Sequence, residues 1–224
     1  INKQKLTDAH TCYKVFDSKL FKQINLEENG FAFCPEITTK ISNLNINYIN
    51  GDITNYDQVQ EATNNMDHVI NLAGLMTPDC SSNPILGAKV NLLGSINVFE
   101  ALKKNNIKFL VYASSAGVFG QKDHYYPFPE THYGAYKLAV EGIARAYFNE
   151  NKISSIGIRP FVLYGPGREI GGTAGITLAC KAAKQGFNFD ISFSGKAGFV
   201  YVEDVCSATL FSNLFKLLRL LLFT

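Results

Sequence analysis

The sequence predicts an α/β protein with a doubly wound parallel sheet, and two observations support this fold class. From about residue 45 onward, short apolar runs alternate with longer amphipathic stretches, a pattern typical of βα units. In addition, 46% of the residues are hydrophobic and 18% are charged, a globular composition that excludes disordered, collagen-like and coiled-coil proteins. With 224 residues, the chain is longer than one small domain requires.

The first predicted elements follow this alternation. Residues 47–50 end a strand, residues 58–64 form a short helix, and residues 67–72 form a buried strand. Residues 87–105 carry apolar positions over a length that predicts one continuous helix. The next apolar run, residues 108–113, predicts another strand of the same parallel sheet.

The alternation continues through the second half of the chain. Residues 133–149 predict an amphipathic helix, residues 155–163 one strand, and residues 176–186 a helix that ends at a glycine. The first 44 residues do not follow this rhythm, and they contain no glycine-rich turn. The βα region therefore begins only after them.

Charge and cysteine usage exclude several kinds of partner and site. The net charge of +2 is too balanced to indicate a nucleic-acid surface. The five cysteines form no C-x-x-C pair and the four histidines no H-x-H pattern, so we expect neither a disulfide framework nor a metal site. Unpaired cysteines favour a reducing, cytoplasmic compartment. The apolar tail over residues 214–223 is too short, and too interrupted by charge, to span a bilayer.

The sharpest local motif is a tyrosine and a lysine four residues apart. Tyr133 and Lys137 share one face of a predicted helix, and an ammonium group beside a phenol favours the phenolate, which can take a proton from a substrate hydroxyl. Such a pair alone is more often surface packing. Ser114 and Ser115 end the strand over residues 108–113, at the edge where parallel sheets bind ligands, although a simple turn would explain two serines equally well.

Several further blocks accompany this motif, and together they resemble one known family. The family is the extended short-chain dehydrogenases/reductases, specifically the NAD-dependent nucleotide-sugar epimerases and dehydratases. The resemblance covers about residues 45 to 210 and is specific, because the blocks occur in the family's order. The blocks are residues 51–54, 69–74, 91–95, 111–120, the Tyr133/Lys137 pair, 158–160 with 164–167, and 199–205.

The resemblance implies a reaction and a set of site residues. Ser115, Tyr133 and Lys137 match the catalytic serine, tyrosine and lysine, and the implied reaction is proton abstraction from a sugar hydroxyl coupled to hydride transfer. The implied cofactor is NAD or NADP, and the implied substrate is a nucleotide sugar or a related small sugar. Besides Tyr133 and Lys137, the implied cofactor-binding residues are Asp52, Ile53, Leu72, Ala73, Gly74, Asn91 and Phe161.

Two further implications concern the substrate and the assembly. Arg168 lies in a glycine-rich loop and is a candidate to bind a phosphate or carboxylate of the substrate, although a solvated loop arginine is an equal alternative. Members of this family often form homodimers through helices like those predicted over residues 87–105 and 133–149. We therefore expect a possible homodimer, and no nucleic-acid partner or membrane span.

The N-terminal segment departs from the family. A dinucleotide-binding fold opens with a strand, a glycine-rich turn and a helix, but Gly30 is the only glycine before Gly51. The sequence therefore predicts an incomplete Rossmann-like sheet that lacks the first β-α-β unit. The alternative to an active enzyme is a truncated or fused remnant that does not bind the dinucleotide.

That segment resembles a different enzyme. Residues 11–16, 25–27 and 31–41 are similar to part of a family-two glycosyltransferase of the dolichol-phosphate-mannose-synthase type. This resemblance spans about residues 8–42 and lacks that family's nucleotide- and metal-binding motifs. We therefore expect three parts: a foreign segment over residues 1–44, a partial epimerase/dehydratase domain over 45–210, and a truncated apolar tail over 211–224.

Overall fold

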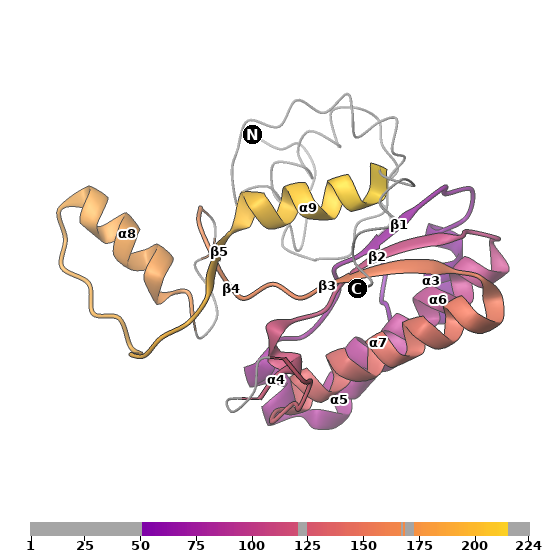
Figure 1. The fold of residues 1–224 in the computed structure, drawn as a ribbon, viewed down its shortest axis with the longest axis horizontal. Coiled ribbons are helices and arrows are strands. Elements are labelled where there is room, and N and C mark those ends of the chain that lie inside the picture. Colours follow the sequence, from indigo (N-terminus) through magenta and orange to yellow (C-terminus); the bar gives the residue numbers. More distant parts are fainter. Residues whose placement is uncertain (1–50, 121–124, 167, 169–172, 215–224) are drawn as a thin grey trace.

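A computed structural model of the chain describes residues 51–120, 125–166, 168 and 173–214, with side chains up to residue 209 (Figure 1). The strand end predicted over residues 47–50 and the segment that resembles a glycosyltransferase lie outside the described residues. The same holds for the expected absence of a first β-α-β unit, which stays a prediction.

The main sheet consists of three parallel strands in the order β1 (Val69–Asn71), β2 (Phe109–Ala113) and β3 (Ser154–Ile158). Asn71 lies opposite Tyr112, and Ala113 lies opposite Ile158. All three strands therefore end at one edge of the sheet, which we name the carboxyl edge.

Helices cover both faces of this sheet. The helices α3 (Tyr56–Ala62), α6 (Gly94–Lys104) and α7 (His132–Asn151) lie on one face, and α9 (Val202–Leu214) lies on the other, where it contacts β2 (Figure 1). Neighbouring parallel strands run in the same direction, so a tight turn cannot join them. The chain instead returns through a helix that crosses one face of the sheet. The predicted α/β class with a parallel sheet is confirmed.

The core lies between the sheet and the helices of the first face. Phe99 and Leu102 of α6 are fully buried, as are Leu110 of β2 and Ile153 before β3. The ring of Phe99 stacks on that of Tyr147 from α7, with 4.7 Å between the ring centroids. Each such side chain contributes about 1.5–3 kcal/mol when it leaves water, so this cluster fixes α6 and α7 on the sheet.

The helix predicted over residues 87–105 is present as one helical run, Pro84–Lys104, that is not regular along its length. It begins with α5 (Pro84–Ala88), which follows a separate short helix, α4 (Thr77–Ser82), and it passes through a π-helical turn, η2 (Lys89–Leu93), before α6. The Asn83 side chain accepts a hydrogen bond from the Leu86 backbone N–H and so starts α5. Apolar periodicity alone does not reveal this π-helical turn, because the apolar face continues across it.

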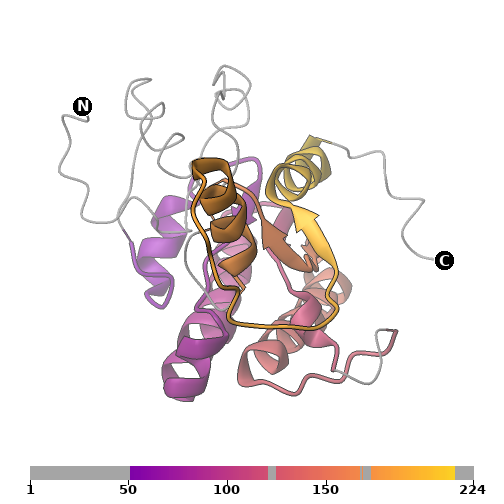
Figure 2. The same cartoon turned by 90° about the vertical axis from the view of Figure 1, so that its left-hand side faces the viewer.

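The strand predicted over residues 155–163 is wrong as a single element. β3 ends at Ile158, and β4 (Val162–Tyr164) belongs to a second, two-stranded parallel sheet with β5 (Phe199–Tyr201). Pro160 interrupts the run because it has no N–H for a sheet hydrogen bond. Figure 2 shows this second sheet with α8 (Gly175–Gln185) in front of it.

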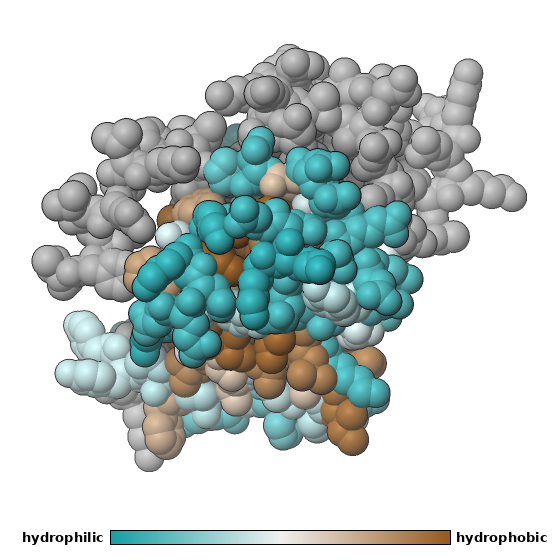
Figure 3. Space-filling view, turned by 90° about the vertical axis from the view of Figure 1, so that its right-hand side faces the viewer, coloured by the Kyte–Doolittle hydropathy of each residue, from teal (hydrophilic) through white to brown (hydrophobic). Residues whose placement is uncertain are grey.

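One continuous helical run in the described residues, Pro84–Lys104, is long and apolar enough to cross a membrane by length and composition. Its buried side chains, such as Val98 and Phe99, pack in the core of this domain. A helix buried in a protein core meets the same criteria of length and composition. The end of the molecule where the main strands begin presents mostly hydrophilic side chains around an apolar band (Figure 3).

Candidate functional site

Residues that follow the three main strands meet at the carboxyl edge. The loop from Leu72 to Gly74 follows β1, Ser114 and Ser115 follow β2, and Arg159 follows β3. Open parallel sheets bind ligands at this edge. The edge therefore gathers three of the blocks that the sequence analysis singled out.

A close backbone approach places Tyr133 beside Ser115. Thr131 caps α7, since its Oγ1 accepts a hydrogen bond from the Gly134 backbone N–H at 3.0 Å. A Cβ on Gly134 would lie only 2.0 Å from the carbonyl oxygen of Gly117, so no larger residue fits there. The Tyr133 ring and the Ser115 hydroxyl both lie next to Gly117. A Cβ on Gly117 would lie 3.3 Å from Ser115 Oγ and 3.6 Å from Tyr133 Cδ1.

Lys137 lies one turn further along α7 and is held in place. Its Nζ donates a hydrogen bond of 2.7 Å to the carbonyl oxygen of Ala113, the last residue of β2. The same Nζ lies 5.6 Å from the centroid of the Tyr133 ring. The i, i+4 spacing thus brings the two side chains together at the end of β2, in the arrangement the sequence predicts.

The electrostatic balance at Tyr133 has opposing causes. Burial raises the pKa of the Tyr133 phenol, whereas its hydrogen bond with Ser115 and the nearby charge of Arg168 lower it. Burial is the larger effect, so the net shift is upward. The sequence argument expected the lysine to lower this pKa, and it did not anticipate how strongly burial of the phenol opposes that effect.

Asn91 joins the loop after β1 to the π-helical turn. Its Oδ1 accepts a hydrogen bond from the Leu75 backbone N–H at 2.9 Å, and its Nδ2 donates to the Leu75 carbonyl and to Cys80 Sγ. The residue is fully buried. π-helical turns often occur at functional sites, since they displace a side chain from the regular helical spacing.

The loop after β1 leaves no space for a side chain at Gly74. A Cβ on Gly74 would lie 2.7 Å from Asn91 Oδ1 and 3.4 Å from Lys137 Nζ. The backbone of Gly74 therefore passes directly against both groups. Leu72, two residues earlier, is 41% exposed. The segment expected to carry a glycine-rich turn lies outside the described residues.

Residues 14–213 match the model of the NAD dependent epimerase/dehydratase family. The chain belongs to this family. The match begins inside the segment that we expected to be foreign, and the glycosyltransferase resemblance of that segment is not shown.

Individual relatives of this epimerase/dehydratase chain agree with the family match. The N-acetyl-alpha-D-glucosaminyl-diphospho-ditrans,octacis-undecaprenol 4-epimerase of Escherichia coli O157:H7 is 30% identical over 148 residues, which cover 63% of this chain and 41% of the relative. The chain spans about half or less of the length of the first curated relatives it matches.

Solved structures share the fold. UDP-N-acetylglucosamine 4-epimerase from Methanobrevibacter ruminantium M1 superposes with a TM-score of 0.69 at 24% identity, over 80% of this chain and 63% of that one. The GalE-like L-threonine dehydrogenase from Cupriavidus necator gives a TM-score of 0.68 at 19% identity, over 76% and 59% of the two chains. These likenesses establish the Rossmann-like epimerase fold and leave the substrate open.

The remaining predicted cofactor residues of this family member lie in different surroundings. Asp52 is exposed, and its Oδ1 accepts a hydrogen bond from the Thr54 backbone N–H. The side chain of Ile53 is buried in the core against Gly94, so it does not face a ligand. Ala73 is half-buried beside Leu72, and Phe161 is 52% exposed beyond the end of β3.

Arg168 lies close enough to Tyr133 for their charges to interact. Burial lowers the pKa of Arg168, and the charge of Tyr133 raises it. The guanidinium Nη2 donates to Thr173 Oγ1 at 3.4 Å. Arg168 is half-buried, and its predicted role in substrate binding stays a prediction.

Sequence reasoning did not identify one cluster at this edge. Ser114, Glu141 and Arg159 form a hydrogen-bonded group behind the catalytic candidates. The available signal was spacing, because Glu141 follows Lys137 by four residues and so shares its helix face.

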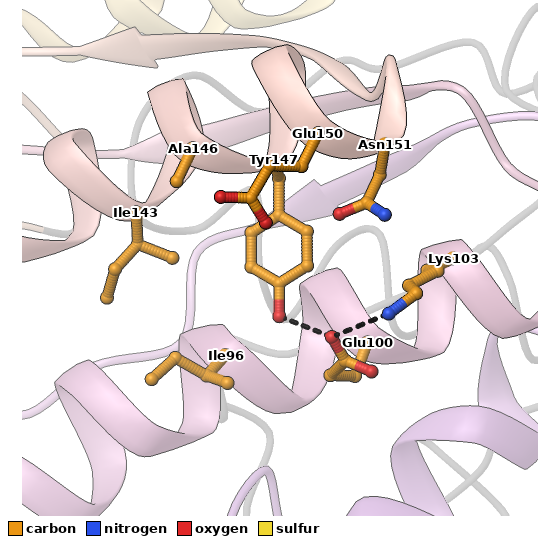
Figure 4. Close-up of a pocket in the computed structure, with 8 residues that line it drawn as sticks. All are labelled: Ile96, Glu100, Lys103, Ile143, Ala146, Tyr147, Glu150 and Asn151. Atoms are coloured by element: carbon orange, nitrogen blue, oxygen red, sulfur yellow. Dashed lines mark hydrogen bonds and ion pairs between the residues drawn. The ribbon is translucent and has the colours of Figure 1, made fainter.

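A separate hollow of about 330 Å³ lies between α6 and α7 (Figure 4). Tyr147 donates a hydrogen bond of 2.6 Å to Glu100 Oε1, and Lys103 Nζ lies 3.7 Å from the same oxygen. Ile96 and Ile143 line its apolar side. None of the predicted catalytic or cofactor residues lines this hollow, so it is distinct from the site at the carboxyl edge.

Proposed function

We propose that this chain is an NAD(P)-dependent oxidoreductase of the epimerase/dehydratase type that acts on a nucleotide sugar or a related sugar. The observation that carries the proposal is the convergence of Ser115, Tyr133 and Lys137 at the carboxyl edge, with the Gly74 backbone against Lys137. The residues thus come from the segments after β1 and β2 and from the first two turns of α7.

Each of the three residues has a chemical role in this proposal. Tyr133 in its phenolate form accepts the proton of a sugar hydroxyl at Oη. Lys137 favours that phenolate through its positive charge, and its hydrogen bond to Ala113 fixes the ammonium group at the site. Ser115 shares a hydrogen bond with Tyr133 and orients the substrate oxygen.

The proposed cofactor contacts come from the loop after β1 and from α7. When bound, NAD or NADP supplies the hydride acceptor for the carbon that carries the hydroxyl. Leu72, Ala73 and Gly74 would pass beneath it with Asn91 behind them, and Tyr133 and Lys137 would face it. Asp52, the Ile53 backbone and Phe161 complete the proposed set.

The substrate proposal is coarser. The Escherichia coli relative is described as an epimerase of a sugar linked through a diphosphate, and the Cupriavidus necator structure as a threonine dehydrogenase. Arg168 beside Tyr133 favours a substrate with a phosphate or carboxylate group. Epimerisation, dehydration and reduction share the same three residues, so substrate trials have to separate them.

Assembly and compartment belong to the same proposal. The proposed homodimer forms through α6 and α7, whose Ile96 and Ile143 line the hollow between them. We propose a reducing, cytoplasmic compartment, because the five cysteines of the sequence are widely spaced and form no C-x-x-C pair.

The competing candidate is a remnant that does not bind a dinucleotide. The observation that favours it is the lack of a glycine-rich turn before Gly51. Without such a turn, no helix N-terminus would meet the pyrophosphate, and affinity would fall severely.

Cofactor binding separates the two candidates. A saturating ligand stabilises a folded protein by mass action, by about 2.7 kcal/mol at a hundred times its Kd. We expect NAD or NADP to raise the thermal midpoint of the wild type but not that of Gly74→Val, because the new side chain would collide with Asn91. Gly142→Ala, a change in open space on α7, is the matched control and should respond as the wild type does.

If neither cofactor shifts the thermal midpoint of the wild type at millimolar concentration, the chain is a remnant that does not bind the dinucleotide, and the proposed enzyme function is wrong. If a shift is present, UDP-sugars and other sugar substrates are then tested for turnover. The absorbance of reduced nicotinamide identifies a net oxidation or reduction, and analysis of the product sugar identifies an epimerase or dehydratase.

A further inference from the structure

We propose that Glu141 is a positioning residue of this site, which ties the ends of β2 and β3 to α7 and so sets where Ser115 meets Tyr133. This inference rests on the proposed role of Tyr133. Glu141 acts through the segments that carry the three catalytic candidates.

Both carboxylate oxygens of Glu141 are used. Oε1 accepts hydrogen bonds from Ser114 Oγ at 2.5 Å and from Arg159 Nε at 2.7 Å, and Oε2 accepts from Arg159 Nη2. The Glu141 side chain is only 14% exposed. A bidentate ion pair between arginine and a carboxylate is both stronger and more directional than a single hydrogen bond between neutral groups.

The location of these contacts relates them to the catalytic candidates. Two successive turns of α7 hold two successive residues at the end of β2: Lys137 bonds to Ala113, and Glu141 bonds to Ser114. Ser115 is the next residue along the chain. The Ser115 hydroxyl is therefore carried by a segment whose two preceding residues are hydrogen-bonded to α7.

The segment after Ser115 is anchored to β3. The Ala116 backbone N–H donates a hydrogen bond of 3.1 Å to the carbonyl oxygen of Pro160, the neighbour of Arg159. The Arg159 guanidinium also lies over the Phe119 ring, 4.9 Å from its centroid. Glu141 thus fixes Arg159, and Arg159 and Pro160 in turn fix the residues on the far side of Ser115.

Several charged or titratable groups surround this cluster. Hydrogen bonding to Glu141 raises the pKa of Arg159, so the guanidinium stays charged. Tyr112 of β2 also faces the pair, as the charges of Glu141 and Arg159 both act on its phenol. Loss of the Glu141 charge would weaken the pair with the half-buried Arg159, and the Arg159 guanidinium would no longer be held in one orientation.

The test uses Glu141→Gln and Ser114→Ala in the full chain, with Glu61→Gln on the exposed surface of α3 as the control. Ser114→Ala removes one contact and keeps the pair of Glu141 and Arg159, so it is the milder of the two changes. The main readout is the ultraviolet titration of the Tyr133 phenol without substrate, taken as the difference between each protein and the same protein carrying Tyr133→Phe.

We expect the Tyr133 titration midpoint to move to higher pH in Glu141→Gln and in Ser114→Ala, because a displaced Ser115 no longer supports the phenolate. In turnover, kcat for Glu141→Gln should fall about tenfold while KM changes by less than about twofold. The low-pH limb of kcat should move upward with the titration. Glu61→Gln should match the wild type in all three measurements.

Unchanged titration midpoints in both variants, even with a lower thermal midpoint, would overturn the inference and leave Glu141 with a purely structural role. If Glu141→Gln does not fold, an unchanged midpoint in Ser114→Ala has the same consequence. Failure of the proposed function would appear elsewhere, as a wild type that does not respond to NAD or NADP.

Discussion

The region around the main sheet and the region around the second sheet are stabilised to different degrees. Every residue of the hydrophobic core cluster lies between Ile53 and Ile153, within the first region. In the second region, large apolar side chains such as Phe187 and Phe199 are 69% and 47% exposed. The first region is a packed domain core, and the second region is held to it by fewer buried contacts.

The two regions are expected to have different roles in the site. Ser115, Tyr133 and Lys137 all come from the well-packed region, where their backbone is fixed by Gly134 and Ala113. Arg168 comes from the second region, as do the exposed Phe187 and Phe199. We infer that the packed region fixes the reacting groups, while the second region is free to vary with the substrate.

The largest expected effect tests the difference in packing directly. Phe99→Ala should lower the free energy of unfolding by about 3–5 kcal/mol, because Phe99 is fully buried and stacked on Tyr147. Phe187→Ala removes the same side chain from an exposed position and should cost less than about 0.5 kcal/mol. Urea unfolding measures both. Equal losses would mean that the two regions do not differ in packing.

A smaller effect concerns the close approach at the start of α7. Gly134→Ala should destabilise the fold by about 3 kcal/mol, because the new Cβ would meet the backbone carbonyl of Gly117, which cannot move aside cheaply. Gly142→Ala on the same helix points into open space and should stabilise the protein by about 0.5–1 kcal/mol. If thermal unfolding shows both variants to be stabilised, α7 does not contact this loop.

The next effect is the pH dependence of Tyr112 in the main sheet. Burial, together with the charge of Glu141, raises the pKa of Tyr112 from 10.0 to about 12. The unfolded chain therefore ionises first, so the stability that the neutral phenol provides is complete below pH 10 and is lost as the pH rises toward 12. This loss amounts to about 2 kcal/mol.

Urea unfolding of the wild type and Tyr112→Phe across that pH range isolates this effect. We expect the wild type to lose stability more steeply, since other titrating groups are common to both proteins. Parallel curves would show that Tyr112 ionises as readily in the folded protein as in the unfolded chain, and that its surroundings are not dry.

The sequence predicted most of the packed region and less of the second. The strands at residues 67–72 and 108–113 and the helix at 133–149 follow directly from apolar periodicity, because each buries one continuous face. The run at 155–163 failed because its apolar residues serve two different sheets. The π-helical turn at Lys89–Leu93 left no trace in periodicity.

The site was predictable to the same uneven degree. The spacing of Tyr133 and Lys137 and the place of Ser115 after a strand were readable, since they depend on local geometry. The partners of Glu141 were not, because Ser114 and Arg159 are separated from it by 27 and 18 residues and meet it only through the sheet register. Burial of Tyr133 is likewise a tertiary effect that no local pattern records.

The central claim is that Tyr133 is the base of an oxidoreductase, and one substitution tests it most directly. Tyr133→Phe should reduce kcat at least about 100-fold and leave the thermal shift with NAD or NADP intact, since the phenyl ring keeps its packing and loses only the proton acceptor. Tyr136→Phe is the matched control on the same helix, because its hydroxyl bonds to the Pro84 carbonyl and has no lysine one turn on. It should keep kcat within about threefold of the wild type. Turnover retained by Tyr133→Phe would contradict the account.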